Sequence, residues 1–159
     1  MSTRTELKDF LIGSSSTAPR QILSSVFPVL EEDVYFNSET RAVRSSSEIY
    51  LKWENQPAGN RDTGREVGHR IIIELYSAVS EPYEEDLLSG DLEAAAKILL
   101  ETYDGDNGRE LFRSVISKNV HIASLQEVTS VIKSNTNDED IHYHSASQSF
   151  VLEVVTWEQ

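Results

Sequence analysis

The chain has no cysteine among its 159 residues. Disulfide bonds, thiolate nucleophiles and cysteine-ligated zinc are therefore excluded, and packing alone must stabilise the fold. No apolar run approaches the ~20 residues that a membrane-spanning helix needs. The first residues, MSTRTELKDFLIG, also lack the apolar stretch of a secretory signal. We therefore expect a protein without membrane partners that is made and kept in a cytoplasm.

Basic residues are scarce. Lysine and arginine number 14 against 27 aspartates and glutamates, for a formal net charge of −13. A field of this sign repels phosphate backbones and anionic membranes. It argues against an ordinary nucleic-acid reader but is compatible with a surface past which DNA slides without sticking. The acidic groups at 31–33, 84–86 and 138–140 lack the ligand pattern of a calcium loop, so we expect solvated turns there.

Hydrophobic residues make up 38% of the chain and charged residues 26%. The first share is too high for a disordered chain, and the second is normal for a soluble surface. A chain of this length can bury a sizeable core. We therefore expect one domain over residues 1–159.

Apolar residues recur at helical spacing in the segments 3–12, 19–27, 89–103 and 109–116. Thr3 or Thr5 is the predicted cap of the first segment. The third is the strongest, because three alanines favour a helical backbone and Ser89 or Asp91 can cap it. A stop and turn are predicted immediately after it, at 104–108.

Alternating apolar and polar residues predict strands at 47–54, 69–79 and 146–157. Segment 119–133 is rich in β-branched residues and predicts a long or bulged strand. Segment 29–36 is a weaker strand candidate, and 134–140 is predicted as a polar loop. This order of elements predicts an α+β fold, with an antiparallel sheet of about four strands and helices packed on it.

A long polar loop is predicted at 55–68, between two of these strands. It exceeds the usual ~2–5 residues of a hairpin loop. It contains Pro57, several glycines and the two arginines Arg61 and Arg65. Loops of this kind serve as binding arms or are plain insertions.

No catalytic signature is visible. His69 and His121 are lone histidines outside any G-x-S-x-G motif, although a small hydrolase built on either one stays an alternative. Segment 59–65 lacks the G-K-[ST] ending of a phosphate loop. His142 and His144 have strand spacing for a metal site, but no third ligand follows from the sequence. We expect no cofactor, no metal and no enzymatic activity.

Apolar residues also occur on the strand faces opposite the predicted helix-covered core: Ile72, Tyr76, Val151, Val155 and Trp157. A one-sided sheet should be polar there. Either a second layer within the chain covers them, for which the N-terminal helices are available, or another subunit does. These five residues, with Arg61 and Arg65, are the predicted subunit and partner interface.

The layout of the chain resembles the tail terminator proteins of long-tailed bacteriophages. The resemblance covers most of the chain and is carried by the N-terminal helix and by the segments SSSEIYLKWEN, GHRIIIELYSA, GDLEAAAKILLETYDG, VHIASLQEVTSVIK and SQSFVLEVVTWEQ. It is a likeness of layout and not of an invariant motif. The split N-terminal helical region and the acidic loop 134–140 are not diagnostic of that family.

This resemblance implies an α+β fold and a hexameric ring at the head-proximal end of the tail tube. Such a ring ends tube polymerisation and provides the surface on which the head docks. The implied partners are identical copies, the tail tube protein and a neck or head-completion protein, with a sheath protein as an option; DNA passes through without specific binding. The alternative is another neck, tube or sheath-associated virion protein.

Overall fold

The computed structural model describes residues 2–37, 47–54, 66–79, 82–129, 132–138 and 141–157. Its elements in chain order are α1 (Thr3–Ile12), α2 (Pro19–Ile22), the 3-10 helix η1 (Glu31–Asp33), β1 (Val34–Phe36), β2 (Ser47–Trp53), β3 (Glu66–Val79), α3 (Pro82–Tyr103), α4 (Gly105–Val115), β4 (Asn119–Glu127), β5 (Ile132–Asp138) and β6 (Ile141–Trp157). The α+β class is confirmed. Among the described residues, no helix is long and apolar enough to cross a membrane.

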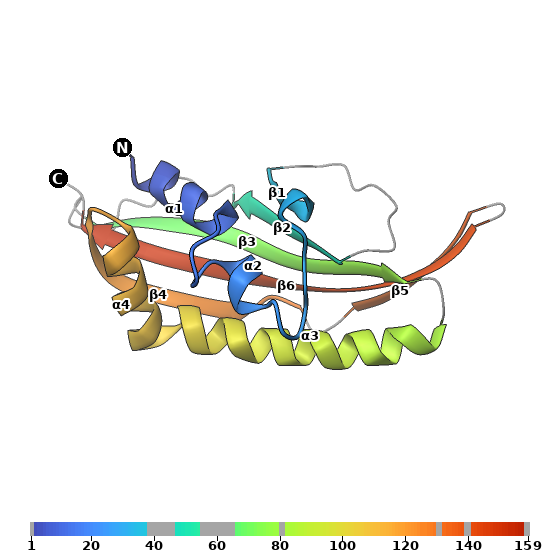
Figure 1. Cartoon of the computed structure of the whole chain (residues 1–159). Coiled ribbons are helices and arrows are strands. Elements are labelled where there is room, and N and C mark those ends of the chain that lie inside the picture. Colours follow the sequence, from blue (N-terminus) through green and yellow to red (C-terminus); the bar gives the residue numbers. More distant parts are fainter. Residues whose placement is uncertain are drawn as a thin grey trace.

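The sheet has six strands in the order β1-β2-β3-β6-β4, and β5 also pairs with β6. All pairs are antiparallel except the parallel pair β1–β2. The long strands β3 and β6 pair along their length and form its centre (Figure 1). The sheet is therefore mainly antiparallel, as predicted, but larger than the expected four strands.

The far edge of β6 is shared by two strands. β4 pairs with its C-terminal half, from Phe150 to Trp157, and β5 pairs with residues 141–147. β3 pairs with β6 only from His144 onward. The β5–β6 hairpin therefore projects beyond the end of β3, as Figure 1 shows.

The four α-helices of the described residues pack on the same face of the sheet, which we call the inner face. Alternate residues of the central strands meet them there, including Ile71, Ile73, Phe150 and Leu152. The helices contribute apolar stripes to this core, and the main contributors are Leu7, Phe10 and Leu11 of α1, Leu92, Ala95 and Leu99 of α3, and Phe112 of α4. Figure 1 shows α3 lying along the direction of the long strands. The N-terminal helices therefore add to the first layer and do not form a second one.

Helix α1 has the predicted bounds but a different cap. The Ser2 hydroxyl, rather than Thr3 or Thr5, occupies the N-cap and accepts a hydrogen bond from the Thr5 N–H at 3.2 Å. On the sheet side, the Arg4 guanidinium lies 4.4 Å from the centre of the Trp53 ring. This cation–π contact ties the first turn of α1 to β2.

Two other helices differ from their predicted lengths. Helix α3 begins at Pro82, so Ser89 and Asp91 lie within it and do not cap it. Proline suits the first turn of a helix, because it has no N–H to leave unpaired there. Helix α2 ends at Ile22, although a backbone hydrogen bond from Phe27 N–H to the Leu23 carbonyl (2.7 Å) continues the turn.

The polar stretch 104–108 was predicted as a stop and turn, but α4 begins within it at Gly105. Gly105 has φ of +69°, a left-handed conformation that glycine adopts without steric cost. The Asp104 carboxylate accepts a hydrogen bond from the Leu125 N–H at 3.0 Å, which fixes this corner to β4. Only Asp104 separates the two helices.

The strand predictions needed four changes. β3 begins at Glu66, so the last residues of the predicted 55–68 loop belong to the sheet; residues 55–65 lie outside the described part. Segment 119–133 is divided into β4 and β5, with a bulge between Val120 and Ile122. Segment 134–140 is wrong as a loop, because β5 continues to Asp138 and β6 begins at Ile141. Segment 29–36 contains a 3-10 turn before the short β1.

The acidic group 31–33 is also less solvated than expected. Asp33 is buried, and the Tyr35 hydroxyl donates a hydrogen bond to its carboxylate at 3.4 Å. The 3-10 turn therefore uses Asp33 as a structural acceptor at the β1 edge of the sheet.

Candidate assembly interface

The face of the sheet opposite the helices, here called the outer face, follows from strand alternation. Side chains of successive strand residues point to opposite faces, so the residues that alternate with the inner-face core residues lie on the outer face. Its residues in the three central strands are Glu48, Tyr50, Lys52, Arg70, Ile72, Glu74, Tyr76, Ser147, Ser149, Val151, Glu153, Val155 and Trp157. No α-helix of the described residues packs on this face.

Ile72 and Val151 form the apolar centre of the outer face. They are direct cross-strand neighbours of β3 and β6, and both are only partly buried. Gln126 of β4 and Lys52 of β2 flank the pair in register. Two adjacent β-branched side chains lie at the middle of a sheet face that carries no α-helix among the described residues, and a contacting partner would bury them.

Tyr76 belongs to a row of aromatic rings that crosses toward the β1 edge. Tyr35 stacks on Tyr50 at 5.1 Å between ring centres, and Tyr50 meets Tyr76 edge to face at 6.4 Å. The Tyr50 hydroxyl donates to the buried Glu48 carboxylate at 2.9 Å. Tyr76 and Tyr35 are half-buried and Tyr50 is buried, so the row is partly open at both ends.

A charged group lies beside the apolar centre. Arg70 contacts Glu54 at 2.8 Å and Glu153 at 3.8 Å, and all three side chains remain between a quarter and a third exposed. Glu74 accepts a longer hydrogen bond from the Ser149 hydroxyl at 3.4 Å. The outer face is thus a mixed surface, in which an arginine between two carboxylates borders apolar side chains.

Val155 and Trp157 lie at the C-terminal end of β6. Val155 is fully buried (0% exposed), so it offers no free area to a partner. Trp157 is partly exposed and meets the His121 ring edge to face at 5.3 Å. His121 also lies 3.5 Å from the Glu66 carboxylate, and Ile122, opposite Val155, is 38% exposed. Ile122 is an apolar contributor that strand periodicity missed, because the bulge changes the alternation of β4.

The structure separates the two lone histidines. His69 lies on the inner face, buried, with its Nε2 3.3 Å from the hydroxyl of the fully buried Thr156. His121 is on the bulge of β4, by the sheet end. Both residues of this pair are buried, with His69 8% exposed and Thr156 0% exposed.

Several predicted residues fall outside what the structure describes. Arg61 and Arg65 lie within residues 55–65, which are not described, and the side chains of His142 and His144 in β6 are not described either. Within the described residues, no group of histidine, aspartate and glutamate could hold a metal ion. The five sheet residues of the predicted interface are described, and four of them share the outer face with exposed area.

Neither a protein-family model nor a curated protein matches the chain. Among solved structures, one similar chain belongs to the "Virion of native gene transfer agent (GTA) particle". The likeness has a TM-score of 0.42 with 10% sequence identity, over 91% of this chain and 97% of that one. At this level of likeness, the case for a function rests on the residues of this chain.

Proposed function

We propose that the chain is a structural virion protein that assembles with identical copies into a ring, through the outer face of its sheet. The observation that carries the proposal is that face itself. It is free of α-helices among the described residues, and it carries partly exposed Ile72, Val151, Tyr76 and Trp157. Partly exposed apolar side chains on a sheet face are typical of a surface that packs against another subunit.

The finer proposal is a tail terminator ring, most simply of six copies, which caps the tail tube and joins it to the neck. The layout resemblance of the sequence motivates it, and the α+β architecture agrees with it. A ring needs a heterologous contact with a closing rotation, so the outer face would meet a different surface of the next copy. The net charge of −13 would keep DNA from adhering in the bore. In this role the protein catalyses no reaction.

The first test is the oligomeric state of single charge insertions on the outer face. Ile72→Lys and Val151→Lys each place an ammonium group at the apolar centre, where burial against a partner would cost several kcal/mol. We expect the wild-type protein to form rings by light scattering after size exclusion and in negative-stain images, either alone or on added tail tubes. Both variants should remain monomeric and should not cap tubes.

The matched control is Leu30→Lys. Leu30 is 61% exposed and precedes η1, so it tests an exposed leucine that is not part of the central strands. Circular dichroism would establish that all three variants fold. A wild-type protein that stays monomeric and leaves tube ends uncapped contradicts the proposal, and so does ring formation by Ile72→Lys.

A further inference from the structure

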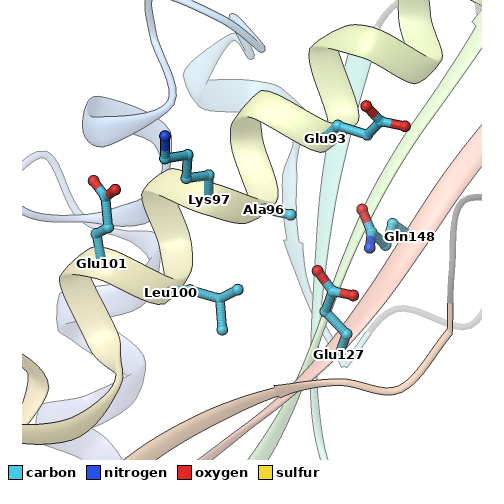
Figure 2. A pocket seen from close by; sticks show the side chains of 7 residues that line it. All are labelled: Glu93, Ala96, Lys97, Leu100, Glu101, Glu127 and Gln148. Carbon is cyan, nitrogen blue, oxygen red and sulfur yellow. The ribbon is translucent and has the colours of Figure 1, made fainter.

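A groove lies on the inner side of the molecule, between α3 and the strands β4 and β6 (Figure 2). It has a volume of about 410 Å³. Its lining residues are Glu93, Ala96, Lys97, Leu100 and Glu101 of α3, Glu127 of β4 and Gln148 of β6. Because the groove lies on the helix side of the sheet, it is separate from the outer face.

The groove is acidic at its rim. Glu93, Glu101 and Glu127 are exposed carboxylates, and Lys97 is the one cation among the lining residues. Figure 2 shows the Glu93 and Glu127 side chains on either side of Gln148, from α3 and β4. Opposed carboxylates across a groove favour a cationic occupant.

Gln148 supplies an independent observation. Its side chain is only 4% exposed, and its Oε1 has no hydrogen-bond partner among the described residues. In Figure 2 its amide points toward α3, between Glu93 and Glu127. A buried acceptor left unpaired costs about 1–3 kcal/mol, so native structures nearly always supply a donor. Within the described residues this acceptor is therefore open to a donor from a water molecule or from a bound group.

The remaining lining limits what the occupant can be. Ala96 and Leu100 make an apolar floor, which suits the methylene stem of a long side chain. Among the described residues, no group of three or more histidine, aspartate or glutamate side chains could hold a metal ion. A cation with several directional donors and an apolar stem fits the groove better than a bare ion.

We propose that this groove binds an arginine side chain from a segment of a partner protein. A guanidinium group carries five N–H donors in a plane, enough to meet the Glu93 and Glu127 carboxylates and to donate to Gln148 Oε1. The methylene stem of the arginine side chain lies over Leu100 and Ala96. This contact is additional to the ring proposed above and does not depend on it, because the two surfaces are on opposite sides of the sheet.

The test is an NMR titration of the ¹⁵N-labelled full chain with N-acetyl-argininamide. The neutral isostere N-acetyl-citrullinamide serves as the matched probe, since it keeps the shape and removes the charge. We expect arginine to shift the Gln148 side-chain amide signals and the backbone signals near Glu93 and Glu127. Citrulline should leave them unmoved, and rising salt should weaken the arginine shifts.

Matched variants locate the site. Glu127→Gln should weaken arginine binding about two- to five-fold, the size of a partly exposed ion pair. Glu110→Gln removes a carboxylate of α4 that is also exposed but does not line the groove, and this variant should bind arginine as the wild type does. Ile72→Lys should also bind normally, which separates this proposal from the ring.

Three results overturn the proposal: no arginine-dependent shifts at the groove, equal shifts with citrulline, or unchanged binding by Glu127→Gln. The Glu110→Gln control excludes a general effect of net charge. A lysine probe, N-acetyl-lysinamide, should bind more weakly than arginine, because an ammonium has fewer donors in a fixed geometry. Equal or tighter binding of lysine would contradict the choice of guanidinium.

Discussion

Tyr103 lies at the C-terminal end of α3, where three aromatic rings meet. Its ring is 6.4 Å from Phe10 and 5.7 Å from Phe112, and its hydroxyl donates to the Thr17 carbonyl at 2.7 Å. It thereby joins α1, α3, α4 and the link before α2. The apolar spacing of α3 predicts that Tyr103 lies near its buried stripe, but only the structure shows which carbonyl the hydroxyl reaches.

The pKa of this buried tyrosine predicts a pH effect. Burial raises the pKa of Tyr103 well above its ordinary value of about 10. The folded state therefore holds this proton more tightly than the unfolded state does. The resulting stabilisation is fully present below about pH 10 and is lost as the pH rises from there through the folded-state pKa.

Tyr103→Phe should lower the free energy of unfolding by about 1 kcal/mol at pH 8, because one hydrogen bond is lost. Above pH 10 the variant should lose stability less steeply than the wild type, so the gap between them narrows. Urea denaturation at pH 8 and pH 11 measures both effects. A gap that stays constant over this range would show that Tyr103 does not titrate as described.

At the scale of elements, a side-chain hydrogen bond and two glycines constrain the corner between α3 and α4. Asp104 ties it to β4, and Gly105 makes the left-handed turn. Gly108 then passes so close to the end of α3 that an added Cβ would lie 1.9 Å from the Tyr103 carbonyl oxygen. Position 108 requires glycine because a side chain there would clash with the Tyr103 backbone. Position 105 favours glycine because its φ is positive.

Gly108→Ala should lower the free energy of unfolding by about 3 kcal/mol or more, since the clash is with backbone that cannot swing aside. Gly90→Ala is the matched control. Gly90 lies within α3, and an added Cβ there meets nothing within 4 Å. The control should gain about 0.4–1 kcal/mol from reduced unfolded-state entropy. Thermal or urea unfolding distinguishes the two, and similar losses for both variants would refute the packing explanation.

For the whole molecule, the acidic charge opposes the assembly that the outer face favours. Identical copies with a net charge of −13 repel one another at low ionic strength. Salt screens this repulsion, and the Debye length falls from about 30 Å at 0.01 M to about 3 Å at 1 M. Ring formation should therefore increase with salt.

Light scattering at 50 mM and 500 mM sodium chloride checks this expectation, with the larger assembly expected at 500 mM. Arginine binding in the groove should change in the opposite direction, since it depends on attraction. A ring fraction that falls with salt would indicate that opposite charges, such as Arg70 and its carboxylate partners, dominate the contact instead of the apolar centre.

Local apolar periodicity is enough to predict the elements in which the period is unambiguous. α1, β2, the core of α3 and the C-terminal part of β6 follow from their apolar spacing, because burial of one face demands that spacing. The same periodicity identified both faces of β3 and β6, including Ile72 and Val151. The α+β class then follows from the order of these elements.

The pairing of the strands and the contacts of each sheet face depend on residues that are far apart in the sequence. β5 forms because β6 is long enough to hold two partners on one edge, a long-range pairing that no local pattern encodes. The N-terminal helices joined the existing helical layer, which leaves the outer face uncovered by α-helices among the described residues. The burial of Val155 and the unpaired Gln148 Oε1 beside the groove could not be predicted from local patterns, because both depend on neighbours that are distant in sequence.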